Sequence, residues 1–377
     1  MAGARVYLMG RLRVGVIYGG RSGEHEVSLR SATSIIHALD PDRYEVIPIA
    51  IAKDGRWLTG PNSLRQLEQA QETLQPIPAT GNEVALAPEP TRRALVPLGS
   101  GSRLALDVVF PVLHGTYGED GTIQGLLDLA DLPYVGAGVA ASAVGLDKAL
   151  MKALFRDAGL PVCRSLVAHP GAESAATLAQ RVADSLGFPC FVKPANLGSS
   201  VGISKVKAPA ELGPAIAEAA AYDAKLIVEE AITGRELECA VLGNEEPAAS
   251  VVGELLPSRE FYDYQDKYVD QGARFIIPAD LAPELADTIR ALAVRAFRAI
   301  DGSGLARVDF FLERGTNRVL INEINTMPGF TQISMYPKLW EASGVPYPTL
   351  LDRLIELGTA RHVARAKRRL SFTPSAG

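Results

Sequence analysis

The chain has 377 residues, of which 47% are hydrophobic and 21% charged, and this balance excludes disordered, collagen-like and disulfide-scaffold proteins. Its formal charge of −5 gives no overall attraction to nucleic acid or to an anionic membrane, so neither is expected as a partner. Cys163, Cys190 and Cys239 are widely spaced and form no CxxC pair, which favours small core residues in a reducing cytoplasm over a zinc framework. No apolar run approaches the roughly 20 residues of a membrane span.

The first predicted elements form a parallel α/β unit that follows a loose extension at residues 1–12. Residues 13–18 form a β-branched run that stops at Gly19, and the apolar positions from 27 to 39 then follow helical spacing. Strands at 44–52 and 105–113 repeat this plan, which predicts an N-terminal α/β domain over residues 13–140. Residues 60–103 are rich in Pro, Gln and Gly with weak periodicity, so we expect a variable insertion at its rim.

The rest of the chain alternates helices and strands as two α+β units. A helix beginning near residue 146, strands at 188–193 and 200–206, a helix at 209–221 and a strand at 225–230 predict a small central domain over 141–232. Short strands over 235–278, an amphipathic helix at 280–300 and a strand pair over 304–325 predict a C-terminal domain over 233–360. The basic tail at 361–377, which includes Arg361 and Arg365, is typical of a solvated helix end.

Two strand ends of the first domain carry candidate ligand-binding residues. The turn GGRSGEHEVS does not fit GxGxxG, which disfavours a Rossmann dehydrogenase. It places Glu24 and Glu26 near a helix N-terminus, where an ionised carboxylate can bind an amine, although a helix-start acid without function is equally compatible. His114 ends a strand before a Gly-rich loop, where parallel α/β sheets bind ligands, and a structural role is again equally compatible.

The segment FVKPANLGSSVGISKV predicts a strand, a Gly/Ser loop and a second strand, which together form a hairpin lid. No Gly-Lys dipeptide occurs in the chain, so a Walker P-loop is excluded. The backbone N–H groups, the hydroxyls of Ser199 and Ser200, and Lys193 can nevertheless surround phosphate oxygens. The alternative is a flexible turn beside an exposed lysine.

The segments GLARVDFFL and VLINEINTMPGFTQIS predict a second hairpin that carries acids. If its turn is centred on Thr316, then Asp309 lies opposite Glu323 and Arg307 lies opposite Asn325. Facing carboxylates repel, so a cation is expected between them, and oxygen ligands from Asp, Glu and Asn suit Mg²⁺. The alternative is a solvated hairpin face with one salt bridge to Arg307.

Three further segments carry weaker signals. Lys148 lies on the polar side of its predicted helix and alone would be a surface lysine. VEEAITGREL ends a strand with Glu229 and Glu230, whose backbone could contact a purine, and Glu236 could contact a ribose. FYDYQDKY places three tyrosines and a lysine in a polar loop of the kind that often forms a lid.

Together, these segments resemble the D-alanine–D-alanine ligases of the ATP-grasp superfamily from about Arg13 to Leu357. The resemblance is carried by the ordered series GGRSGEHEVS, HGTYGEDG, VKPANLGSSVG, FYDYQDKY, ARVDFF and NEINTMPGFT. It implies a three-domain ATP-grasp fold and an ADP-forming ligase that joins two D-alanines through an acyl phosphate for peptidoglycan synthesis. It further implies ATP, two Mg²⁺ ions with Mn²⁺ as a substitute, and a cytoplasmic homodimer. The alternatives are D-alanine–D-lactate or D-alanine–D-serine ligation, or a non-catalytic ATP-binding module.

The resemblance also assigns roles to individual residues. It implies that Glu24 holds the ammonium of the first D-alanine and is linked to Ser199 and Tyr268, and that Arg307 and the backbone N–H of Gly329 stabilise an oxyanion. His114 is implied to bind substrate, and Lys267 and Ser334 are implied to hold the carboxylate of the second D-alanine. The implied metal ligands are Asp309, Glu323 and Asn325. The implied nucleotide contacts are Lys148, Lys193, Ser199, Ser200, Glu229, Glu230, Ile232, Glu236, Lys267, Asn322 and Glu323. Tyr268, in the sequence DKY, favours the dipeptide over a D-lactate product.

Overall fold

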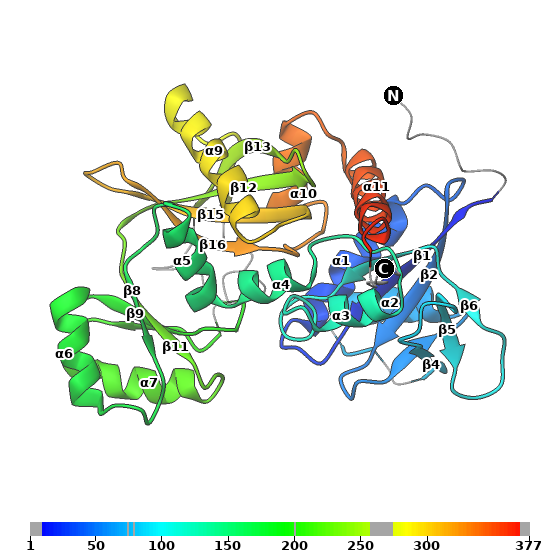
Figure 1. Ribbon diagram of the computed structural model, residues 1–377, viewed down its shortest axis with the longest axis horizontal. Helices are drawn as coiled ribbons and strands as arrows, with labels where there is room; N and C mark the ends of the chain where they lie inside the picture. The colour runs from blue at the N-terminus through cyan, green and yellow to red at the C-terminus, as the bar shows by residue number, and fades with distance from the viewer. Residues whose placement is uncertain (1–9, 74, 78–79, 200, 257–273, 370–377) are drawn as a thin grey trace, which may run out of the picture.

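The computed structural model describes residues 10–73, 75–77, 80–199, 201–256 and 274–369, and it arranges them around three β-sheets (Figure 1). The first sheet is formed by the N-terminal part of the chain, the second by its middle and the third by its C-terminal part. None of the described helices combines the length and the apolar character needed to cross a membrane. Cys163, Cys190 and Cys239 are buried free thiols, which confirms that they are core residues.

The first sheet has seven strands in the order β6-β5-β4-β3-β2-β1-β7. Its strands are β1 (Leu12–Gly19), β2 (Tyr44–Ile51), β3 (Trp57–Thr59), β4 (Asn82–Leu86), β5 (Ala94–Pro97), β6 (Leu104–Ala105) and β7 (Val108–Val112). β1 pairs in parallel with both β2 and β7, and its continuous apolar run is buried on both faces, as a central parallel strand requires. The helices beside it are α1 (His25–Ala38), α2 (Ser63–Thr73) and α3 (Thr122–Leu129).

Two expectations for this sheet need correction. The sheet is mixed, because β3, β4, β5 and β6 join it by antiparallel pairing. The segment 60–103 lies at the rim as expected, but it supplies α2, β4 and β5 and therefore extends the sheet itself. Its strands are short and lie toward one edge, so their periodicity in the sequence is weak.

The second sheet has four antiparallel strands in the order β10-β9-β11-β8. The elements of this part are α4 (Val139–Leu146), α5 (Lys148–Asp157), β8 (Ser165–Ala168), α6 (Ala175–Ser185), β9 (Cys190–Pro194), β10 (Ser204–Val206), a 3-10 turn (Pro209–Glu211), α7 (Leu212–Ala220) and β11 (Leu226–Glu230). Buried residues of α6 and α7 share one core with the strands. The pairing of β9 with β10 confirms the predicted hairpin.

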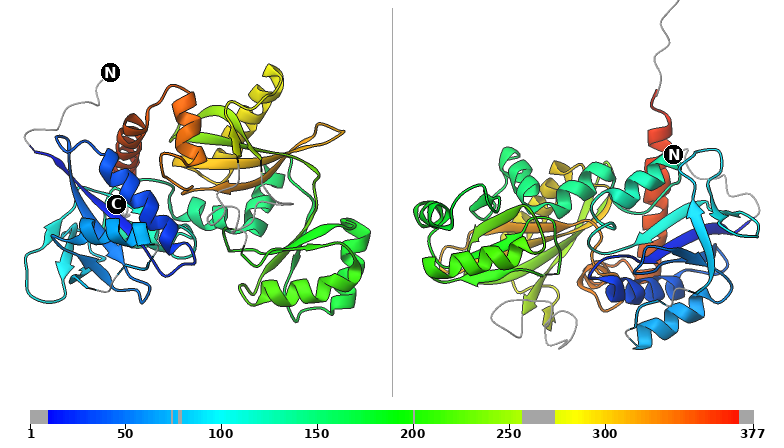
Figure 2. Two further views of the ribbon diagram at one scale, coloured as in Figure 1. Left: turned by 180° about the vertical axis from the view of Figure 1, so that it is seen from behind. Right: turned by 90° about the horizontal axis from the view of Figure 1, so that it is seen from below.

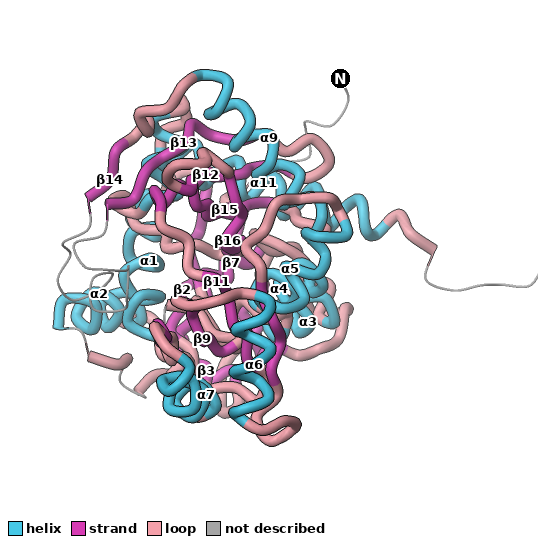
Figure 3. Tube along the Cα trace, turned by 90° about the vertical axis from the view of Figure 1, so that its left-hand side faces the viewer, coloured by secondary structure: helices cyan, strands magenta, loops and turns pink. Residues whose placement is uncertain are grey.

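The third sheet has five antiparallel strands in the order β14-β13-β12-β15-β16. Its elements are β12 (Gly234–Gly243), β13 (Ala248–Leu256), β14 (Arg274–Ile276), α9 (Pro283–Ala299), β15 (Gly304–Glu313), β16 (Val319–Asn325) and α10 (Met335–Ala342). Val308 and Phe310 pack with α9 on one face, so Arg307 and Asp309 point to the opposite face, as the strand alternation predicts. α4 and α5 lie beside β16 (Figure 3).

The last helix, α11 (Tyr347–Ala366), packs against the first sheet although it lies at the far end of the chain (Figures 1 and 2). Leu350 and Leu354 share a core with residues of β1 and β7. Arg361 donates hydrogen bonds to the Gly136 carbonyl at 2.8 Å and to Ser303 Oγ at 2.9 Å, and Arg365 forms an ion pair with Asp128. The expectation of a solvated helix end is therefore wrong for these two arginines.

Candidate active site

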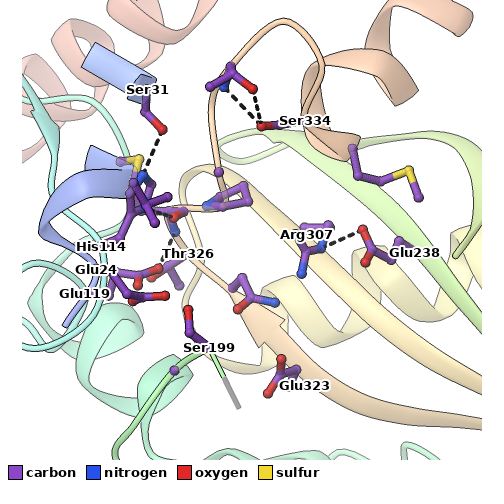
Figure 4. Close-up of a pocket in the computed structure, with 18 of the residues that line it drawn as sticks. Glu24, Ser31, His114, Glu119, Ser199, Glu238, Arg307, Glu323, Thr326 and Ser334 are labelled. Carbon is purple, nitrogen blue, oxygen red and sulfur yellow. Dashed lines mark hydrogen bonds and ion pairs between the residues drawn. The ribbon is translucent and has the colours of Figure 1, made fainter. Parts of the chain in front are cut away.

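A cavity of about 710 Å³ lies where the first sheet, the β9–β10 loop and the β15–β16 hairpin meet (Figure 4). The predicted site residues that line it are Glu24, His114, Lys148, Ser199, Arg307, Glu323, Asn325, Gly329 and Ser334. The described residues that were predicted for the site but do not line this cavity are Lys193, Glu229, Glu230, Ile232, Glu236, Asp309 and Asn322. Ser200, Lys267 and Tyr268 lie outside the described residues.

Arg307 is held on the floor of the cavity by two acids. Its Nε and Nη2 donate to the two carboxylate oxygens of Asp309, each at 2.7 Å, and its Nε lies 2.9 Å from Glu238 Oε2. Burial opposes the charge of Arg307, but Asp309 and Glu238 raise its pKa well above the ordinary value. The result is a permanently charged, fixed guanidinium that can stabilise developing negative charge.

Glu238 also belongs to this site, although it was not among the residues predicted from the sequence. It lies on β12 between the buried residues Leu237 and Cys239 and is itself 5% exposed. A buried acid needs a partner, and Glu238 finds it in Arg307 on the neighbouring strand. The sequence feature that could have revealed Glu238 is an acid within an otherwise apolar strand, because such an acid is rarely buried without a charged partner.

The register of the acidic hairpin confirms the predicted pairs. Arg307 lies opposite Asn325, and Asp309 lies opposite Glu323. Beyond Asp309 the ladder shifts by one residue, so that Phe310 pairs with Ile321. This bulge leaves Asn322 without a partner in the ladder.

Side-chain cations already relieve part of the repulsion expected between the two acids. Asp309 is paired with Arg307, and Glu323 lies 3.5 Å from the ammonium of Lys148. Lys148 also donates to the Leu197 carbonyl at 2.8 Å, so it connects the β9–β10 loop to β16. A metal ion is therefore not needed merely to keep these carboxylates together.

The residues at the hairpin nevertheless fit a magnesium site in which the protein supplies only some of the ligands. Asn325 Nδ2 donates to Asp309 Oδ2 at 3.0 Å, and this bond leaves the amide oxygen of Asn325 as a possible ligand. Within the described ranges no cluster of three His, Cys, Asp or Glu side chains could hold a metal by itself. An ion here would therefore draw many of its ligands from water and phosphate, which is the usual manner of Mg²⁺.

Glu24 and Glu119 lie next to one another on the opposite side of the cavity (Figure 4). Glu119 Oε2 accepts the Gly115 N–H at 2.7 Å, and its Oε1 accepts the Met327 N–H at 3.3 Å. Gly115 has φ +73°, which residues with a side chain rarely adopt, and a Cβ there would lie 2.7 Å from Glu24 Oε2, so a larger residue would be strained and would displace the Glu24 carboxylate. Burial, followed by the charge of Glu24, raises the pKa of Glu119 to about 8.

Glu119 was not among the residues predicted for the site. It lies in the motif HGTYGEDG, where only His114 was considered. The sequence feature that could have revealed Glu119 is an acid after Gly115 and Gly118, in a loop that follows a parallel strand, where ligands commonly bind.

We expect the substitution Glu119→Gln to increase stability more at high pH than at low pH. The raised pKa means that the stabilising contribution of Glu119 is complete below its unfolded pKa of about 4.3 and is lost as the pH rises through about 8. The gain in unfolding free energy over the wild type should therefore grow by at least about 1 kcal/mol between about pH 6 and about pH 8.5. Urea unfolding at the two pH values measures it.

The matched control is Glu26→Gln on the same side of the fold. Glu26 pairs with Lys53 at 2.6 Å, and although burial opposes it, this lysine lowers the pKa of Glu26 below the ordinary value. Its contribution should therefore be nearly constant over this pH range. An equal gain for Glu119→Gln at both pH values would show that Glu119 is not protonated in the fold.

His114 connects the first sheet to the loop after β16. Its Nδ1 lies 3.0 Å from the Met327 carbonyl, which can only accept, so Nδ1 carries the proton and Nε2 accepts from Ser31 Oγ at 3.0 Å. Burial lowers the pKa of His114 to about 4, so the ring is neutral. The Phe330 N–H in turn donates to Ser31 Oγ at 3.2 Å. Because both ring nitrogens are used, His114 can shape the loop around Gly329 but has no nitrogen left for a ligand.

The remaining predicted residues lie along the seam between the second and third sheets. Lys193 on β9 donates to Glu229 Oε2 at 2.6 Å. The carboxylate of Glu230 accepts from the Arg164 N–H at 2.8 Å and from its Nε at 2.7 Å, and the Glu230 N–H donates to the Arg164 carbonyl at 3.1 Å. Ile232 lies in the connection from β11 to β12, and Glu236 lies near the start of β12.

Two family models match the chain, the D-ala D-ala ligase N-terminus over residues 13–137 and the D-ala D-ala ligase C-terminus over residues 154–356. The D-alanine–D-alanine ligase of Solibacter usitatus is 54% identical over 352 residues, which cover 93% of this chain and 97% of the relative. The enzyme of the same name from Geobacillus kaustophilus is 48% identical over 371 residues, with 96% and 98% covered.

Two solved structures share the fold over nearly the whole chain. The D-alanine-D-alanine ligase from Coxiella burnetii has a TM-score of 0.81 and 40% identity, covering 95% of this chain and 96% of its own. The VanG D-Ala:D-Ser ligase from Enterococcus faecalis has a TM-score of 0.82 and 34% identity, covering 93% and 100%. Both halves of the family's sequence pattern and its complete fold are present, and the chain therefore belongs to the D-alanine–D-alanine ligase family.

Proposed function

We propose that the chain is an ATP-dependent ligase that joins two D-alanines through an acyl phosphate. The observation that carries this proposal is that one cavity contains a fixed guanidinium, Arg307, with oxygen ligands at Glu323 and Asn325 on one side and the acids Glu24 and Glu119 on the other. These are groups that can neutralise a transferring phosphoryl group, stabilise an oxyanion and bind an ammonium. The identity to curated ligases along almost the whole chain supports the same activity.

In the first proposed step, a carboxylate oxygen of D-alanine attacks the γ-phosphorus of ATP. The bond from that phosphorus to the bridging oxygen breaks, ADP leaves, and the products are ADP and an acyl phosphate. Glu24 holds the ammonium of this D-alanine, with Ser199 and Tyr268 beside it. Magnesium, or manganese in its place, would be held by Asp309, Glu323 and Asn325 and would supply charge neutralisation at the phosphates.

The nucleotide would lie along the seam between the second and third sheets. Lys148 and Lys193, with Ser199, Ser200 and Lys267, would contact its phosphates, and Asn322 and Glu323 on β16 would also contact the nucleotide. The backbones of Glu230 and Ile232 would contact the adenine, beside the carboxylate of Glu229. Glu236 would contact the ribose.

In the second proposed step, the amine of another D-alanine attacks the acyl carbon. A C–N bond forms, the C–O bond to phosphate breaks, and inorganic phosphate and the dipeptide leave with loss of a proton from the amine. Arg307 and the Gly329 N–H would stabilise the oxyanion, while Ser334 and Lys267 would hold the second carboxylate. His114 supports this site indirectly, through Ser31 and Met327.

We expect phosphate release that requires both D-alanine and magnesium, with D-alanyl-D-alanine as the main product. Phosphate measurement followed by product chromatography tests this, first with D-alanine alone and then in competition with D-serine and D-lactate. Release with another amino acid but not with D-alanine would refute the proposal. The serine arm is needed because the D-Ala:D-Ser ligase and a D-alanine-D-alanine ligase match this fold equally well, with TM-scores of 0.82 and 0.81.

Two wider features also belong to this proposal. The free buried thiols support a reducing, cytoplasmic location, where peptidoglycan precursors would be made. A homodimer is proposed from the family resemblance, and sedimentation of the purified protein would measure it.

A further inference from the structure

Lys152 on α5 is a buried lysine that the proposed reaction does not use. Its side chain is 1% exposed. Lysine is almost never buried to this extent without a compensating partner. Its Nζ lies 3.1 Å from Glu229 Oε1 and donates to the Asn322 carbonyl at 2.9 Å.

Glu229 is shared between two lysines. While its Oε1 faces Lys152, its Oε2 accepts from Lys193 at 2.6 Å, and the carboxylate is 2% exposed. Burial alone would raise the pKa of Glu229, but Lys152 and Lys193 lower it to about 2, so it is ionised at neutral pH. The cluster Lys152–Glu229–Lys193, called here the lysine triad, therefore carries one surplus positive charge.

The second contact of Lys152 ties the lysine triad to the acidic hairpin. The bulge in β16 removes Asn322 from the ladder, and its carbonyl accepts from Lys152. One helical turn earlier on α5, Lys148 pairs with the next residue of the hairpin, Glu323. Lys148 and Lys152, on one face of α5, thus contact two successive residues of β16. Of these two lysines, only Lys152 also contacts β11 of the second sheet, through Glu229.

We propose that Lys152 is a positioning residue for nucleotide binding, which acts by sharing Glu229 so that Lys193 keeps positive charge available for the phosphates. This rests on the proposed function, which places Lys193 at the phosphates. Without Lys152, Glu229 would neutralise Lys193 completely, and the attraction for a polyphosphate would fall. A purely structural ion pair would stabilise the fold without this link to Lys193.

The test is a double-mutant cycle between Lys152→Met and Glu229→Gln, both of which nearly conserve shape. We expect K152M to weaken binding of Mg·ADP, measured by calorimetry without D-alanine, by about tenfold or more, and to raise the KM for ATP equally. The KM for D-alanine should change by less than about twofold. In the E229Q background the same substitution should weaken Mg·ADP binding by less than about threefold, because no carboxylate is left to neutralise Lys193.

Equal effects of K152M in both backgrounds would overturn the proposal, since Lys152 would then act without Glu229. If K152M alone does not fold, the Mg·ADP affinities of E229Q and K152M/E229Q are compared instead. These two variants contain no carboxylate at position 229, so neither buries an unpaired carboxylate there. A loss of about tenfold between those two variants would also contradict the proposal.

The control for lost stability is Arg361→Met, which removes a half-buried arginine that binds Gly136 and Ser303 away from the lysine triad. It should lower the melting temperature and leave Mg·ADP affinity unchanged. A wild-type protein that neither binds Mg·ADP nor releases phosphate would refute the proposed function. A functional wild type whose Mg·ADP affinity K152M does not change would refute this inference alone.

Discussion

Replacing Arg307 by alanine is expected to lower kcat by about 10²–10³-fold while the KM for ATP changes by less than about threefold. The guanidinium is fixed between Asp309 and Glu238, and the reaction develops negative charge at the acyl oxygen only in the second step. An interaction made mainly in the transition state affects turnover and leaves ground-state affinity nearly unchanged. Initial rates of phosphate release, with ATP and D-alanine varied in turn, give both constants.

The lysine variant separates charge from geometry at this position. Arg307→Lys keeps a cation beside Asp309 and Glu238 but cannot reproduce the two parallel hydrogen bonds to Asp309. We expect its kcat to lie between those of the wild type and R307A. Removing the arginine takes away the cation that pairs with Asp309 and with the buried Glu238 and should cost about 3–5 kcal/mol of stability, so folding is checked by thermal unfolding. Losses of equal size in turnover and in ATP affinity would contradict the assigned role.

Glu323→Gln is expected to raise the magnesium concentration for half-maximal activity by about tenfold or more and to lower kcat by about 10²-fold. The substitution keeps the shape of the side chain but removes the charge that would bind the metal ion and that pairs with Lys148 at 3.5 Å. Asn325 and Asp309 would remain as weaker ligands, so higher magnesium should restore part of the activity. A magnesium titration at fixed ATP measures the change.

Glu313→Gln is the matched control on the same hairpin. Glu313 also pairs with a cation, Arg318, at 2.8 Å, but it lies at the far end of β15. Its variant should have the magnesium dependence of the wild type. If the two variants gave the same magnesium curve as the unmodified protein, Glu323 would not be a metal ligand.

The hairpin shows how much of the candidate site the sequence could predict. A turn centred on Thr316 predicted Asp309 opposite Glu323 and Arg307 opposite Asn325, and both pairs form. The strand pairs nearest the turn are instead centred between Gly315 and Thr316, so these two pairs depend on the extra residue that the bulge adds to β16. The bulge at Asn322 was not predicted, since nothing in the local sequence marks one extra residue. The hydrogen bond from Lys152 to the Asn322 carbonyl depends on this bulge and therefore could not be predicted either.

Contacts between distant elements were the part that the sequence could not predict. Glu238 meets Arg307 across two strands, and Glu119 meets Glu24 across two loops of the first sheet. Such pairs depend on packing in three dimensions, whereas periodicity reports only which face of one element is buried. The roles given to Ser200, Lys267 and Tyr268 stay predictions, because these residues lie outside the described part of the chain.

The position of α11 has a consequence for how the protein reaches its fold on the ribosome. β1 and β7 share their core with Leu350 and Leu354, which are translated more than two hundred residues later. A nascent chain that has emerged only as far as the third sheet would leave this apolar surface uncovered. The first sheet to be synthesised is thus among the last to be completed, and such non-local closure slows folding and favours protection by a chaperone until α11 has emerged.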